Sequence, residues 1–272
     1  MDEAKKSRKP HTSIFMEHKR GLISFVILLA VLLGLLRLFC REPASRPAAK
    51  TSSLQSCRVC YLLNIDGMKG LGHSALLLID ESGAGQLFSY NGMQYNLLEC
   101  LMGKEGIGKM KVISMNSEET EDFLETGRPP ETAFTGGSFE ECRDFDRILF
   151  RCITEQEYLA ILQAADVYID TGDEFERLYA AARSSEATEQ ARKEMDAFLS
   201  QEGLPRYQIY SHNCDTAARE IIALADPEMA AYNDTQACLI PGNNYRKMCR
   251  FLGDSWGYGA LGNDSWLEKQ LS

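Results

Sequence analysis

Positive charge is scarce in most of this sequence. The chain of 272 residues has 29 Lys and Arg against 39 Asp and Glu, which gives a formal net charge of −10. Residues 1–50 hold ten of the basic residues and only four of the acidic ones, a balance of +6, so residues 51–272 carry −16. An acidic domain repels a phosphate backbone, and we therefore expect no nucleic-acid partner.

Histidine is scarcer still, with four residues in the whole chain. His11 and His18 lie in a basic N-terminal tail, which leaves His73 and His212 for the rest of the sequence. Histidine is the side chain most often used as a general base near neutral pH. Any nucleophile in this protein therefore has few bases to choose from.

A second cysteine pair that could complete a metal site is missing. Cys57 and Cys60 have redox or metal spacing, but no other pair matches it, so we expect no zinc and no other metal or cofactor. Eight cysteines follow residue 40. In an oxidising compartment a structural disulfide is the simpler interpretation of the Cys57–Cys60 pair, with its connectivity open.

One long apolar run stands near the N-terminus. Residues 21–40 are almost wholly apolar and about long enough to cross a bilayer, and residues 1–20 before them are basic. This pattern predicts a single-pass transmembrane anchor with a cytoplasmic tail; the alternative, a cleaved signal peptide, would have a shorter apolar run. Residues 41–55 are rich in Pro, Ala and Ser and predict a linker. We expect residues 56–272 to form a domain outside the cytoplasm.

Cys214 is the strongest candidate for a reactive residue in this sequence. Residues 207–210 predict a short strand and residues 215–225 a helix, with Asn213 at the N-cap position. Cys214 then lies in the first helical turn, where unpaired N–H groups and the helix dipole favour the thiolate. The same N–H groups can hold an oxyanion.

The second candidate residue is His73. It begins an apolar stretch, residues 73–79, which predicts a strand, and a glycine-rich turn leads to a returning strand at residues 86–91. The antiparallel return brings Ser89 or Asn91 near the imidazole, which either side chain could orient.

The remaining elements follow from turn and capping signals. Residues 116–140 contain two prolines and three glycines and predict a long loop or lid. We expect strands at 109–115 and 146–153, a helix beginning with the Thr154–Glu157 capping box, a second helical stretch at 174–199, a loop at 233–244 and a last helix at 245–252.

Taken together, these motifs resemble those of the circularly permuted papain-like cysteine hydrolases. A Gly-His precedes a hydrophobic strand and hairpin within Leu71–Asn91, and a Tyr-x-x-Asn-Cys opens a helix within Tyr207–Leu224. That group includes relatives of lecithin:retinol acyltransferase and bacterial enzymes of the cell-wall endopeptidase type. The resemblance implies Cys214 as nucleophile, His73 as base, no metal or cofactor, and an α+β fold. In that fold the cysteine helix packs on an antiparallel sheet, here with a helical insertion.

The expected reaction is attack of the thiolate on an amide or ester carbonyl of a peptide or lipid substrate, through a thioester. His212 competes as the base, provided that the turn before the helix folds back. Two other classes of protein remain open. One is a catalytically silent binding module. The other is a structural domain in which Cys214 forms a disulfide, with Cys238 or Cys249 as partners.

Overall fold

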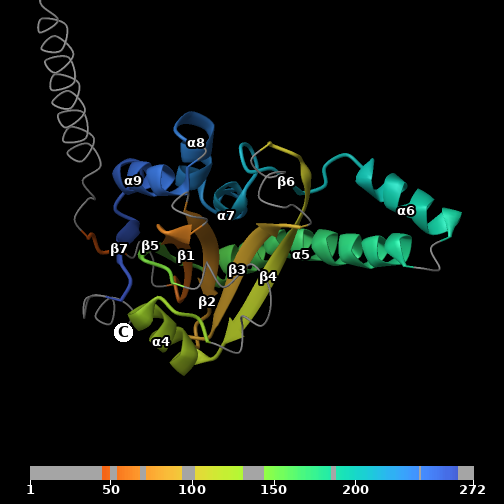
Figure 1. Cartoon of the computed structure of the whole chain (residues 1–272). Coiled ribbons are helices and arrows are strands. Elements are labelled where there is room, and N and C mark those ends of the chain that lie inside the picture. Colours follow the sequence, from red (N-terminus) through yellow and green to blue (C-terminus); the bar gives the residue numbers. More distant parts are fainter. Residues whose placement is uncertain are drawn as a thin grey trace, which may run out of the picture. The chain divides into compact units, whose positions relative to one another are not determined.

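The computed structural model describes residues 45–49, 54–67, 72–93, 102–130, 144–184, 188–238 and 240–262 (Figure 1). This part of the chain is α+β, with one antiparallel seven-stranded sheet in the order β6-β4-β3-β2-β1-β5-β7 and six helices. The predicted fold class is confirmed at this level. Within the described ranges no helix is both long and apolar enough to cross a membrane. The predicted tail and anchor, residues 1–20 and 21–40, lie outside those ranges.

The elements have the following bounds. The strands are β1 (Cys57–Asn64), β2 (His73–Ile79), β3 (Gly85–Gly92), β4 (Gly106–Met115), β5 (Arg147–Ile153), β6 (Arg206–Tyr207) and β7 (Trp256–Ala260). The helices are α4 (Ser117–Thr126), α5 (Glu155–Arg183), α6 (Glu189–Leu199), α7 (Cys214–Ala223), α8 (Pro227–Thr235) and α9 (Pro241–Phe251).

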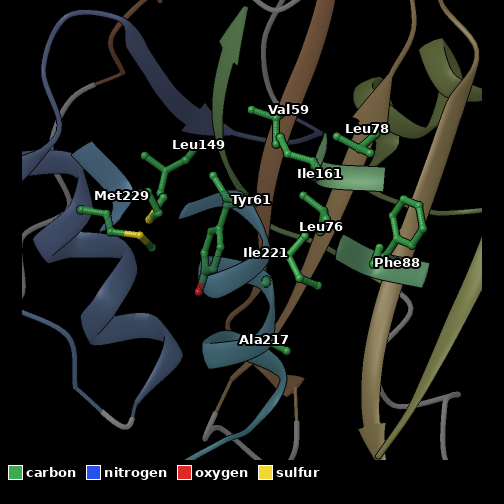
Figure 2. Close-up of a cluster of buried hydrophobic side chains, with 14 of the residues drawn as sticks. Val59, Tyr61, Leu76, Leu78, Phe88, Leu149, Ile161, Ala217, Ile221 and Met229 are labelled. Atoms are coloured by element: carbon green, nitrogen blue, oxygen red, sulfur yellow. The ribbon is translucent and has the colours of Figure 1, made fainter. Parts of the chain in front are cut away.

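One face of the sheet, which we call the α7 face, is covered by α5, α7, α8 and α9. Tyr61, Leu76 and Phe88 point to this side and form a cluster with Ala217 and Ile221 of α7. Figure 2 shows Tyr61 beside these two helical residues. The strands are buried on both sides, so they show long apolar runs rather than a polar–apolar alternation.

The opposite face, which we call the α4 face, has a separate core. The alternate residues Leu62, Leu77 and Leu87 point to this side, where they pack with Phe123 of α4. In Figure 1 α4 lies across the sheet from α7, α8 and α9. Because successive strand residues point to opposite faces, the position of a residue along a strand decides which core it joins.

Residues 116–140 do not form the continuous loop predicted from the sequence. Residues 117–126 are α4, while residues 131–140 lie outside the described ranges. The helix begins with a reciprocal capping box, in which Asn116 accepts from the Glu119 N–H and Glu119 accepts from the Asn116 N–H. Phe123 supplies its buried apolar side chain. The prolines and glycines that suggested a loop all follow this helix.

Two other predicted boundaries were wrong. The capping box at Thr154 is confirmed, but α5 continues through Gly172 to Arg183, past residue 174, where the second predicted helix was expected to begin. A Cβ at Gly172 would lie 3.1 Å from the Lys109 Cα, so the glycine allows α5 to approach β4. The predicted loop at 233–244 instead includes the end of α8 and the start of α9. A proline occupies the first turn of each of these two helices, where its missing N–H costs nothing.

Part of the predicted linker is held against the sheet. Arg46 pairs with Tyr258 of β7 through two backbone hydrogen bonds of 2.9 and 2.8 Å. Its guanidinium donates to the carbonyls of Leu252, Gly253 and Trp256. These carbonyls follow the C-terminus of α9, where a cation is favoured. Residues 45–49 therefore pack with the domain that the sequence assigned to residues 56–272.

Candidate functional site

The N-terminus of α7 is built as the sequence predicted. Asn213 has extended backbone angles (φ −109°, ψ −170°), and its side-chain oxygen accepts from the N–H groups of Asp215 (3.0 Å) and Thr216 (3.2 Å). The Asn213 amide donates to the Ile209 carbonyl at 3.0 Å, which holds the cap against the preceding turn. Cys214 is the first residue of the helix and is 3% exposed.

His73 lies on the α4 face of the sheet. It pairs with Asn64 in the regular β1–β2 ladder, and its position in β2 gives it the same direction as Ala75 and Leu77, which belong to the α4-face core. The centroid of its ring is 6.4 Å from that of Phe145, a member of the same core. His73 is 1% exposed.

The structure brings His73, Ser89 and Asn91 together. The His73 Nε2 lies 2.9 Å from the Ser89 Oγ, and the Asn91 amide donates to that Oγ at 3.0 Å. Because Asn91 donates to this oxygen, the Ser89 hydroxyl hydrogen can be donated to an unprotonated Nε2. Burial lowers the pKa of His73 to about 4, so the ring is neutral at pH 7.

The predicted Cys214–His73 dyad is therefore not assembled in this arrangement. Cys214 opens a helix that packs on the α7 face, whereas the imidazole of His73 points into the opposite core. The next residue, Ser74, points toward α7 instead, with its Oγ 2.6 Å from the Tyr61 hydroxyl. The expected direction, toward the α7 face, is therefore taken by Ser74, the residue next to His73 in β2.

The other candidate base, His212, lies on the same face as Cys214. The chain folds back before α7, since Gln208 and His212 exchange two backbone hydrogen bonds of 2.8 and 2.9 Å. The ring of His212 stacks on that of Tyr168 from α5, with centroids 6.1 Å apart, and meets the ring of Tyr90 from β3 edge-on. The turn before α7 therefore folds back, as the alternative with His212 as base requires.

The imidazole of His212 has a carboxylate beside it. Its Nδ1 lies 3.4 Å from the Glu220 Oε2, and its Nε2 lies 3.4 Å from the Tyr168 hydroxyl. Burial lowers the pKa of His212, Glu220 raises it and Arg219 lowers it further. The side chain is 24% exposed, so solvent reaches it. Both contacts are long, and the ring is held loosely enough to turn.

His212 and Cys214 flank a single extended residue, Asn213. An extended residue places its two neighbours' side chains on the same side of the chain, and Asn213 between them is extended. His212 and Cys214 therefore lie on one side of the chain, at the start of α7.

A buried polar network that was not predicted from the sequence lies next to Cys214. Asp215 is fully buried and accepts from the Tyr61 hydroxyl, from the Arg219 guanidinium at 2.9 and 3.1 Å, and from the Asn244 amide at 2.6 Å. Tyr232 of α8 donates to the Asn244 side-chain oxygen at 2.7 Å. The Asp-Arg spacing of four within an apolar helix was the one available signal.

The cysteines differ from the expectation of a disulfide. All six described cysteines are thiols: Cys57, Cys60, Cys152, Cys214, Cys238 and Cys249. Cys57 belongs to the core of the α7 face and Cys60 to that of the α4 face, because three residues along a strand reverse the direction of the side chain. The two sulfurs of the Cys-x-x-Cys pair therefore cannot bond to each other without rearrangement of β1.

Among the described residues, no group of three or more His, Cys, Asp or Glu side chains is arranged to hold a metal ion. No protein-family model, curated protein or solved structure matches the chain.

Proposed function

We propose that this protein is a thiol hydrolase or acyltransferase in which Cys214 is the nucleophile and His212 is the base. One observation carries the assignment. His212 folds back onto the same sheet face as the cysteine, beside Glu220, while His73 points into the other core. The fold-level expectation of a cysteine helix on an antiparallel sheet agrees with the proposal, although fold alone does not define an activity.

The chemistry uses groups at the start of α7. His212 takes the proton from Cys214, and the thiolate attacks the carbonyl carbon of an amide or ester, forming a C–S bond. Backbone N–H groups at the helix terminus stabilise the oxyanion. The protonated His212 then gives its proton to the leaving amine or alcohol as the C–N or C–O bond breaks. Water or an acceptor amine or alcohol resolves the thioester.

The substrate pool follows from the proposed location. An anchor at residues 21–40 would hold the domain outside the cytoplasmic membrane, where wall peptides and lipids carry suitable amide and ester bonds. The acidic charge of the chain favours neutral or basic substrates such as peptide cross-bridges. We propose peptide amides first and lipid esters second, with the membrane as partner and no nucleic acid.

The test is the pH dependence of alkylation at Cys214. In the parent protein, iodoacetamide modification of this residue, followed by mass spectrometry, should persist well below the ordinary thiol pKa of about 8.5. His212→Gln should move the profile toward that ordinary value. His73→Gln should leave it in place, because His73 lies on the other face.

The matched variants separate the two histidines. If His73→Gln shifts the profile and His212→Gln does not, the base assignment is overturned and the pairing implied by the family resemblance returns. Cys214→Ala serves as the control, since it must abolish the signal at this position under the same reducing conditions.

A second candidate function is a catalytically silent module. The burial of Cys214 at 3% exposure and the polar network at Asp215 favour it, because both are what a helix anchored for stability would have. It predicts ordinary thiol reactivity that increases only when the protein unfolds. If Cys214 of the parent protein is alkylated only at urea concentrations that unfold it, and not below them, this alternative is supported over the enzyme.

A further inference from the structure

The Asp215–Arg219 pair is the most deeply buried ion pair that the structure describes next to the proposed site. The Asp215 side chain is fully buried and that of Arg219 is 3% exposed. Both lie on α7, one and five residues after Cys214. Burying two charges costs solvation energy that their attraction often fails to recover, so such a pair is weak evidence for a stabilising role by itself.

The charge of the pair reaches the site. The Arg219 guanidinium lowers the pKa of His212, so the imidazole responds to this buried cation. Asp215 adjoins Cys214 in the chain and opposes the same cation. If the carboxylate of Asp215 is neutralised less completely than the guanidinium of Arg219, the local electrostatic potential is negative; in the opposite case it is positive. Such a potential acts more strongly in the low-dielectric interior than in water.

The other titratable groups facing the pair are neutral at pH 7. Tyr61 of β1 and Tyr232 of α8 contact it, and burial raises the pKa of each phenol. Glu220, which faces His212, is the one further charge identified at that ring. Tyr61 donates to the Asp215 carboxylate, and Asn233 accepts from the Arg219 guanidinium. The hydrogen-bond partners thus hold both charges in place without cancelling either.

We propose that Asp215 and Arg219 are positioning residues that set the protonation of Cys214 and His212 through their balance of charge. This role of the ion pair rests on the proposed function, because it concerns the same thiol and imidazole. The test itself measures only the reactivity of the Cys214 thiol. A role limited to stability would make both substitutions act alike. A role in setting charge makes them act in opposite directions.

The experiment compares Asp215→Asn with Arg219→Gln in the folded full-length chain. Asp215→Asn leaves the guanidinium less opposed, so alkylation of Cys214 at pH 7 should become roughly tenfold faster, which corresponds to a thiol pKa lowered by about one unit. Arg219→Gln leaves the carboxylate less opposed and should slow it by a similar factor. Equal directions, or no change in either variant, would overturn the inference.

Tyr61→Phe keeps the test decisive if a charge variant fails to fold. It removes one hydrogen bond to the Asp215 carboxylate and should slow alkylation, in the same direction as Arg219→Gln. An unchanged rate in this variant would count against the inference.

The control is a second buried ion pair on the same face. Asp226 is 2% exposed and accepts from Arg151 and, at 3.1 Å, from the Trp256 indole. Asp226→Asn should destabilise the fold but leave the alkylation profile of Cys214 in place. The assignment of His212 as base is tested separately, with His212→Gln. The base assignment and the role of the ion pair can therefore be overturned independently.

Discussion

The two faces of the sheet carry the two histidines in different settings. On the α4 face His73 is sealed among apolar rings, with Ser89 and Asn91 as its polar neighbours. On the α7 face His212 is partly exposed and lies next to a carboxylate. Burial without a charge gives a ring that stays neutral and serves packing. Burial lowers the pKa of His212 as well, but there Glu220 opposes the shift, so the second ring differs from His73 in having a carboxylate beside it.

The largest expected effect concerns the ion pair of the α7 face. Asp215→Ala leaves the Arg219 guanidinium buried without its carboxylate, which we expect to lower the free energy of unfolding by about 3–5 kcal/mol. Urea unfolding followed by circular dichroism measures this loss. A loss below about 1 kcal/mol, the range of an exposed pair, would show that this network is not the anchor of α7.

The next effect is acid sensitivity originating on the α4 face. The pKa of His73 is about 4 in the folded protein and about 6.5 when unfolded, so folding favours the neutral ring. Its contribution is complete above pH 6.5 and is lost as the pH falls from about 6.5 to about 4, by about 3 kcal/mol in all. His73→Gln should flatten this part of the curve of stability against pH. A parent and variant with parallel curves would contradict the assignment.

A smaller effect is expected from the hydroxyl that connects the two neighbours of His73. Ser89→Ala removes the Oγ that contacts His73 and Asn91 and should cost about 1–3 kcal/mol, because the buried His73 and the half-buried Asn91 each lose a partner. The alkylation profile of Cys214 should not move. A shift of that profile would show that the two faces communicate.

The smallest effect compares the two helix caps. Asn213→Ala and Asn116→Ala each remove a side chain that caps a helix, at a cost of about 1 kcal/mol. Thermal unfolding should show similar losses. Only the Asn213 variant should also change the alkylation profile of Cys214, since that cap adjoins the thiol. If neither variant changes the alkylation profile of Cys214, the Asn213 cap does not influence the thiol.

Local signals predicted much of the fold. The apolar run of β2 gave the bounds His73–Ile79, the capping box at Thr154 gave the start of α5, and Asn213 gave the start of α7. The helix α4 was missed because glycines and prolines farther along suggested a loop, although Asn116 and Glu119 already formed a capping box. For the site, the sequence predicted Cys214 as nucleophile and His73 as base, with His212 as the competing base.

The sequence by itself determined the strand β2, the starts of α5 and α7 and the position of Cys214 in a first turn, because these depend on neighbouring residues and on hydrogen bonds a few residues apart. Only the tertiary structure decided which side of the sheet each polar residue faces. The strands are apolar on both sides, so no alternation in the sequence distinguishes the direction of His73 from that of Ser74. That direction depends on where α4 and α7 pack, and both helices are distant from β2 in the sequence.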